Sequence, residues 1–191
     1  MYHPADPLRG PGLTQVLGIT LTVFGNPEIF ALELEIEPDP SIRFMGNEPL
    51  GRIRVWISGN SFGCREEPSC PFAALVDELW AISDRKFYAW NPSLEPRTPS
   101  ERFHVLDDLL FGPGGADRVP SSLDCSSFLT NTVECFNDLK GFVLTPSDEA
   151  LQVMVLDQLH GRFGNALVPK DFMREIATNA LDWAKSNRRD A

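Results

Sequence analysis

The residue types most capable of chemistry gather in one short segment, which contains Glu101, His104 and Asp108. At about 100° per residue along a helix, these three side chains fall within about 60° of one another. Two carboxylates and an imidazole on one face could bind a metal ion or transfer a proton, as in a small hydrolase or metal-dependent enzyme. An ordinary solvated face is the alternative, because Phe103 and Leu106 point the other way.

Cysteine and histidine supply the other reactive groups. They are Cys64, Cys70, Cys125, Cys135, His3, His104 and His160. The cysteine spacings match neither the short pair of a structural zinc site nor a dense disulfide framework, so we expect reduced thiols and no cofactor. A zinc site, or a nucleophilic set of Cys64 or Cys125 with His104 and Asp107, is a weaker alternative that no local motif supports.

Two segments with a period of two predict a pair of antiparallel strands, over 29–37 and 52–57. Each has apolar residues on one side and polar or amphipathic residues on the other. The residues of that second side are Glu33, Glu35, Glu37, Arg52, Arg54 and Trp56. We expect this side to face water, with arginines of one strand near glutamates of the other. An outward indole implies that Trp56 either is covered by another element or belongs to a partner surface.

The sequence also predicts three helices, one of which carries Glu101, His104 and Asp108. The first begins after Pro71 and carries an apolar stripe to Ile82. The second, within 98–112, begins with a capping box and has Gly112 where a C-terminal cap belongs. The third follows Pro169, with acidic residues early and basic residues late, as the helix dipole favours.

The back half of the chain predicts three further short strands. They cover Leu139–Thr145, Leu151–Asp157 and Phe163–Val168. Runs of strands with helices appended indicate an α+β fold: a mostly antiparallel sheet with three main helices packed chiefly on one face, in a single domain. The expected organisation is a mobile leader over 1–22, which begins with a segment rich in proline and glycine, one domain over 23–187 and a tail over 188–191.

The composition of the chain limits the kinds of partner and function that it can have. The chain has 191 residues, of which 42% are hydrophobic, and its net charge is −10. A chain of this composition can bury a core, so disorder is excluded. Its negative charge makes nucleic acid and anionic lipid poor partners and a basic protein a good one. The apolar stretch Leu13–Phe24 is interrupted by polar residues, so we expect no membrane segment and a cytoplasmic location.

Several short motifs resemble one protein family. In the front half they are Phe24-Gly25-Asn26 and Gly51–Ile57, and the capped helix from Ser100 fits the same pattern. In the back half, Glu134–Gly141 and Val168–Met173 are similar to the family's acidic and aromatic run and to the entry into its last helix. The family is the bacterial immunity protein 42 family.

This resemblance implies a protein that is not an enzyme, is encoded beside a polymorphic toxin, and binds and blocks the toxin domain in the producing cell. An acidic surface would suit a toxin that is basic. An acidic adaptor for an endogenous protein and the enzyme hypothesis are the alternatives. The candidate partner-binding residues are Glu33, Glu35, Glu37, Trp56, Glu101 and Asp108.

Overall fold

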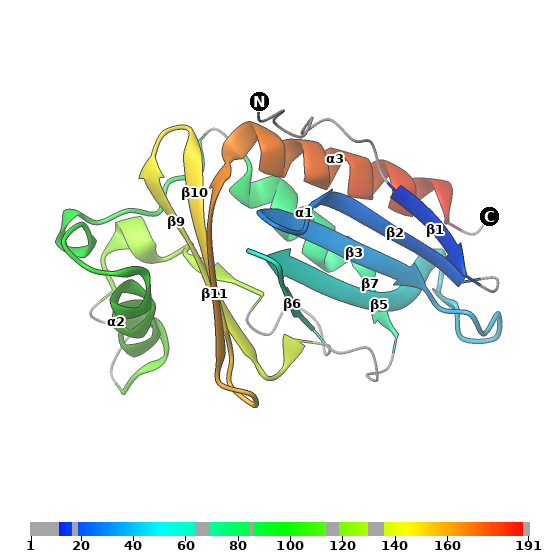
Figure 1. Ribbon diagram of the computed structural model, residues 1–191, viewed down its shortest axis with the longest axis horizontal. Helices are drawn as coiled ribbons and strands as arrows, with labels where there is room; N and C mark the ends of the chain where they lie inside the picture. Colours follow the sequence, from blue (N-terminus) through cyan, green and yellow to red (C-terminus); the bar gives the residue numbers. More distant parts are fainter. Residues whose placement is uncertain are drawn as a thin grey trace, which may run out of the picture.

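The larger of two antiparallel sheets forms one half of the molecule (Figure 1). The computed structural model describes residues 12–16, 19–63, 69–84, 86–113, 119–129 and 136–188, with only the backbone for 12–20. The sheet order is β1-β2-β3-β5-β4, and β6 and β7 also pair with β5. The strands are β1 (Gly12–Val16), β2 (Ile19–Asn26), β3 (Phe30–Ile36), β4 (Phe44–Met45), β5 (Glu48–Ile57), β6 (Asn60–Phe62) and β7 (Cys70–Pro71).

The second sheet follows later in the chain, in the order β11-β10-β9-β8. Its strands are β8 (Ser127–Phe128), β9 (Leu139–Ser147), β10 (Ala150–Asp157) and β11 (Arg162–Pro169). Strands β9, β10 and β11 form a meander of two hairpins, and all their pairings are antiparallel. The three strands predicted for the back half are therefore confirmed, with ends that differ by one or two residues.

Helices α1 (Phe72–Ile82) and α3 (Lys170–Ser186) lie together along one face of the first sheet (Figure 1). Helix α2 (Pro99–Phe111) packs against the second sheet, as do the short 3₁₀ turns η1 (Pro92–Leu94) and η2 (Ser121–Leu123). The predicted capping box is present at Thr98 and Glu101, and the Gly112 amide donates to the carbonyl of Asp108. Within the described residues, no helix has the length and apolar composition needed to cross a membrane.

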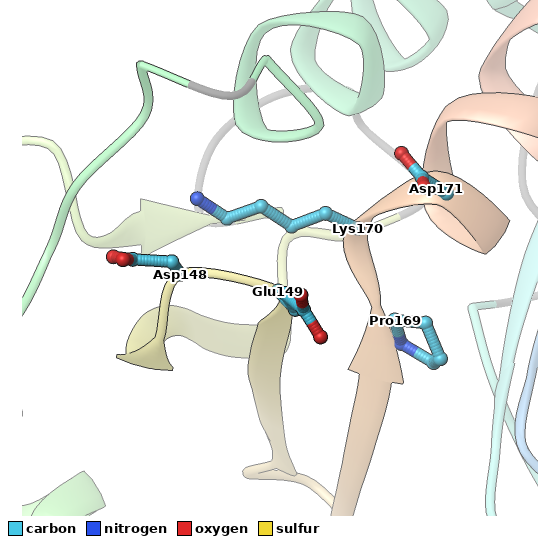
Figure 2. A pocket seen from close by; sticks show the side chains of 5 residues that line it. All are labelled: Asp148, Glu149, Pro169, Lys170 and Asp171. Atoms are coloured by element: carbon cyan, nitrogen blue, oxygen red, sulfur yellow. The ribbon is translucent and has the colours of Figure 1, made fainter.

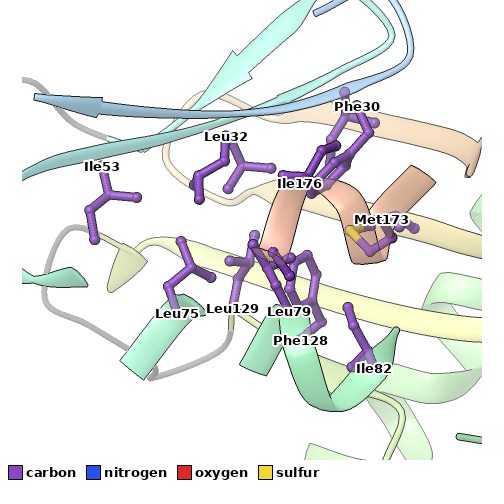
Figure 3. Packing of buried hydrophobic residues seen from close by; sticks show 14 of the residues in the cluster. Phe30, Leu32, Ile53, Leu75, Leu79, Ile82, Phe128, Leu129, Met173 and Ile176 are labelled. Carbon is purple, nitrogen blue, oxygen red and sulfur yellow. The ribbon is translucent and has the colours of Figure 1, made fainter. Parts of the chain in front are cut away.

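One hydrophobic core joins the two sheets through α1 and α3 (Figure 3). Phe30 and Leu32 of the first sheet pack with Leu79 of α1, Ile176 of α3 and Phe128 of the second sheet, and each is at most 1% exposed. The opposite face of the second sheet packs against α2 in a smaller cluster. The orientation of α3 is therefore fixed by contacts with both sheets.

The predicted α+β class, with antiparallel strands and three helices, is confirmed. The strands divide between two sheets, so α2 has a sheet of its own instead of sharing one face with α1 and α3. Strands β1 and β2 begin inside the predicted leader over 1–22, where they pair antiparallel with Gly12 opposite Val23 and Val16 opposite Ile19. Residues 1–11 and 189–191 lie outside the described part of the chain.

Candidate partner-binding surface

A pocket lies between the turn that joins β9 to β10 and the junction of β11 with α3 (Figure 2). Its volume is about 730 Å³, within the range of small-molecule or side-chain binding cavities. Five residues line it: Asp148, Glu149, Pro169, Lys170 and Asp171. Its lining therefore includes three acidic residues and one lysine.

Lys170 holds the two sides of the pocket together. Its amide donates to the carbonyl of Glu149 at 2.8 Å, and its Nζ donates to the carbonyl of Phe87 at 2.9 Å. The residue is only 5% exposed, so its charge is directed into the protein. The carboxylates of Asp148, Glu149 and Asp171 belong to exposed residues, so they dominate the charge that a partner meets at this mouth.

The helix pair beside the pocket continues the same surface. Trp80 of α1 is 39% exposed, and the guanidinium carbon of Arg174 lies 5.0 Å from the centre of its ring. Arg174 is one helical turn beyond Asp171, so Trp80 lies next to the start of α3. Asp77 and Glu175 are also exposed and occupy the outer faces of the two helices near this contact.

The glutamates predicted to face water on the first sheet are buried instead. Glu33, Glu35 and Glu37 are 5%, 9% and 8% exposed. Arg54 pairs with Glu33, and Arg52 pairs with Glu35 at 2.7 Å, so the predicted cross-strand pairing is confirmed. The expectation of a wet face was wrong because neighbouring long side chains cover the carboxylates of this central strand.

Trp56 takes part in the same network. Its Nε1 donates to Glu33 at 2.9 Å, and the guanidinium of Arg54 lies over its ring, 5.6 Å from the centroid. Trp56 is half-buried, so its indole is partly covered from within the sheet. At the end of the strand, a hydrogen bond from the hydroxyl of Ser69 lowers the pKa of Glu37, against the opposing effect of burial.

The second predicted group lies on α2, on the far side of the second sheet from α1 and α3. Glu101, His104 and Asp108 are all exposed, as a solvated helix face requires. Glu101 is already used by the cap: hydrogen bonds from the amide and the hydroxyl of Thr98, both at 2.7 Å, lower the pKa of its carboxyl. The geometry thus gives Glu101 a structural role at the helix start.

The structure describes two of the four cysteines, Cys70 and Cys125. Cys70 is buried, whereas Cys125 is exposed and its Sγ lies 3.5 Å from the carbonyl of Tyr88. Cys64 and Cys135 lie outside the described residues. In the part of the chain that the structure describes, no group of three or more His, Cys, Asp or Glu side chains could hold a metal ion.

Sequence reasoning missed the pocket and the exposed Trp80. Two adjacent acidic residues in a hairpin turn, Asp148 and Glu149, were a usable signal, because a turn leaves its side chains in water. Trp80 falls outside the buried stripe of α1, and a helical projection of that stripe would have revealed it. The contact of both features with α3 depends on the tertiary fold.

Comparison with known families decides the class of the protein. The model of the family described as immunity protein 42 matches residues 21–183. The chain belongs to the immunity protein 42 family. The match covers strands of both sheets and all or most of each helix, omitting only β1 and the ends of β2 and α3, so the family assignment rests on the fold and not on one motif.

A solved structure also resembles this family member. It is the crystal structure of CdiI from Burkholderia dolosa AUO158, with a TM-score of 0.56 and 12% sequence identity, covering 84% of this chain and 99% of that one. At this identity the likeness concerns the fold. No curated protein matches the sequence.

Proposed function

We propose that this chain neutralises a toxin domain by binding it directly in the cytoplasm of the cell that makes both proteins. Membership of the immunity protein 42 family carries the proposal. The net charge of −10 supports a basic toxin, because opposite charges speed association and favour a correct encounter. Neither nucleic acid nor a membrane is needed as a direct partner.

The exposed carboxylates are better candidates for the contact than the buried ones. Glu33, Glu35 and Glu37 already accept hydrogen bonds from neighbouring side chains, so a partner would have to displace those contacts first. Trp56, Glu101 and Asp108 stay predictions as contact residues. The acidic mouth of the pocket requires no such exchange, since Asp148 and Glu149 form no ion pair with any described residue.

Co-expression tests this proposal. The toxin domain encoded by the adjacent gene is induced alone or together with this chain, and growth is followed. We expect inhibition by the domain alone and restored growth with the chain. Inhibition that persists when both proteins are present at equal amounts would contradict the proposal.

A titration of the purified proteins distinguishes binding from catalysis. An inhibitor that acts by binding blocks its toxin fully only near one chain per toxin domain. An enzyme that inactivated the toxin would act at far lower ratios. We expect the stoichiometric result, with the complex recovered intact by size-exclusion chromatography.

A further inference from the structure

The surface around Trp80 has an apolar centre. Trp80 of α1 is 39% exposed, and Ala74 and Ala81 elsewhere on the same helix are also exposed. Helix α1 uses its other side, including Leu75 and Leu79, for the core, and the guanidinium of Arg174 lies over the Trp80 ring. Tryptophan is enriched among the residues that contribute most to protein association.

Trp80 is also held in place before any partner arrives. The guanidinium of Arg174 stacks on its ring at 5.0 Å, and Arg174 extends from α3, which is packed against both sheets. A side chain whose position is already fixed loses little conformational entropy on binding. The indole therefore presents a rigid apolar edge.

Exposed acidic side chains lie on both of these helices, α1 and α3. Asp77 precedes Trp80 by one helical turn, and Glu175 follows Arg174 on α3. The pocket next to them adds the three exposed carboxylates at its mouth, while Lys170 inside it donates to the carbonyl of Phe87. We name this region the acidic-aromatic surface, made of Asp77, Trp80, Asp148, Glu149, Asp171 and Glu175.

We propose that the acidic-aromatic surface docks a basic segment of the toxin, which places an arginine or lysine side chain in the pocket and apolar atoms against Trp80. The inference rests on the proposed function, because it names where and by what chemistry the toxin is held. An apolar centre with a charged rim is the usual composition of a protein interface. The cavity of about 730 Å³ has room for a long basic side chain.

Charge complementarity favours a basic toxin segment at this surface over a second copy of this chain, a nucleic acid or an anionic lipid surface. A second copy of this chain that docked through the same surface would bring carboxylates against carboxylates, which is costly at an interface. A nucleic acid or an anionic lipid surface would meet the same repulsion. A segment rich in lysine and arginine is attracted by the rim, and its aliphatic stems can pack on the indole.

The test measures association and dissociation rates with the toxin domain encoded by the adjacent gene. The first variant is Trp80→Ala, and the second combines Asp148→Asn with Glu149→Gln. The matched control combines Glu95→Gln with Asp138→Asn, two exposed residues that directly follow η1 and directly precede β9. Both double variants change the net charge equally, so any difference between them reports a local contact.

We expect Trp80→Ala to weaken binding about tenfold or more, mainly through faster dissociation. The pocket variant should associate several-fold more slowly and depend less on salt, while the control stays within about twofold of the wild type. Equal effects of the two double variants, or unchanged rates for both Trp80→Ala and the pocket variant, would overturn the inference while leaving the proposed function standing. A wild-type chain that does not bind the toxin domain would instead remove the proposed function itself.

Discussion

Two carboxylate-rich regions of this protein differ in how their charge is balanced. On the first sheet, Glu33 and Glu35 are buried and face arginines on the neighbouring strand at matched register. At the pocket, Asp148 and Glu149 lie in an exposed turn and form no ion pair with a described residue. The first arrangement stabilises strand pairing, and the second leaves negative charge available to a partner.

The largest effect is expected from Glu33→Gln. The substitution leaves Arg54 without its counter-charge at a site where both side chains are largely buried, at 6% and 14% exposure. We expect a loss of about 3 kcal/mol in the free energy of unfolding, measured by chemical denaturation, because an uncompensated buried charge is costly. A loss below about 0.5 kcal/mol would mean that solvent already screens this pair.

A double-mutant cycle sharpens this result. Replacing both partners, as Glu33→Met with Arg54→Met, removes the charge imbalance that either single change creates. We expect the double variant to lose less stability than the sum of the two singles, with a coupling of about 2 kcal/mol. Additive losses would show that the two residues act independently.

Asp157 on β10 gives a pH-dependent test of a buried carboxylate. Burial alone would raise the pKa of Asp157, but hydrogen bonds from Arg162 and from the amide and ring of His160 lower it below the usual range. A pKa that is lower in the folded state stabilises the fold above the unfolded value, near 3.9, and this contribution disappears as pH falls through the folded value.

We therefore expect Asp157→Asn to cost about 1 to 3 kcal/mol at pH 7. The difference from the wild type should shrink steadily as the pH is lowered below about 4. Denaturation curves collected between pH 7 and pH 2.5 measure it. A difference that stays constant across this range would show that the charge of Asp157 does not stabilise the hairpin.

The smallest effect is expected at the pocket. Asp148→Asn with Glu149→Gln should change the free energy of unfolding by less than about 0.5 kcal/mol, because both side chains are exposed. The same denaturation assay used for Glu33→Gln measures it. A loss approaching that of Glu33→Gln would mean that these carboxylates support the fold and would remove the contrast between the two regions.

Local signals in the sequence were sufficient to predict where the three helices begin. Pro71 precedes α1 and Pro169 precedes α3, and the capping box with Gly112 bounds α2 within one residue. Strands β1, β2 and β6 and the two-residue strands β4, β7 and β8 were not predicted. A two-residue pairing is too short to leave a periodic pattern in the sequence.

Exposure was harder to predict than secondary structure. The alternation along β3 correctly separates its two faces, but it does not reveal that Arg52, Arg54 and Trp56 cover the glutamates. The pocket joins a turn at Asp148 to a helix start at Asp171, and this proximity depends on how α3 packs against both sheets. A single sequence contains no direct signal for that contact.

Hydrogen exchange of the chain, alone and bound to the toxin domain encoded by the adjacent gene, tests the proposed complex most directly. We predict slower exchange in the complex for amides of 77–82, 148–149 and 171–175, with no added protection in β3 or α2. Added protection confined to α2 or to β3 and β5, with the segments around Trp80 and the pocket unchanged, would contradict the assignment of the toxin-binding surface.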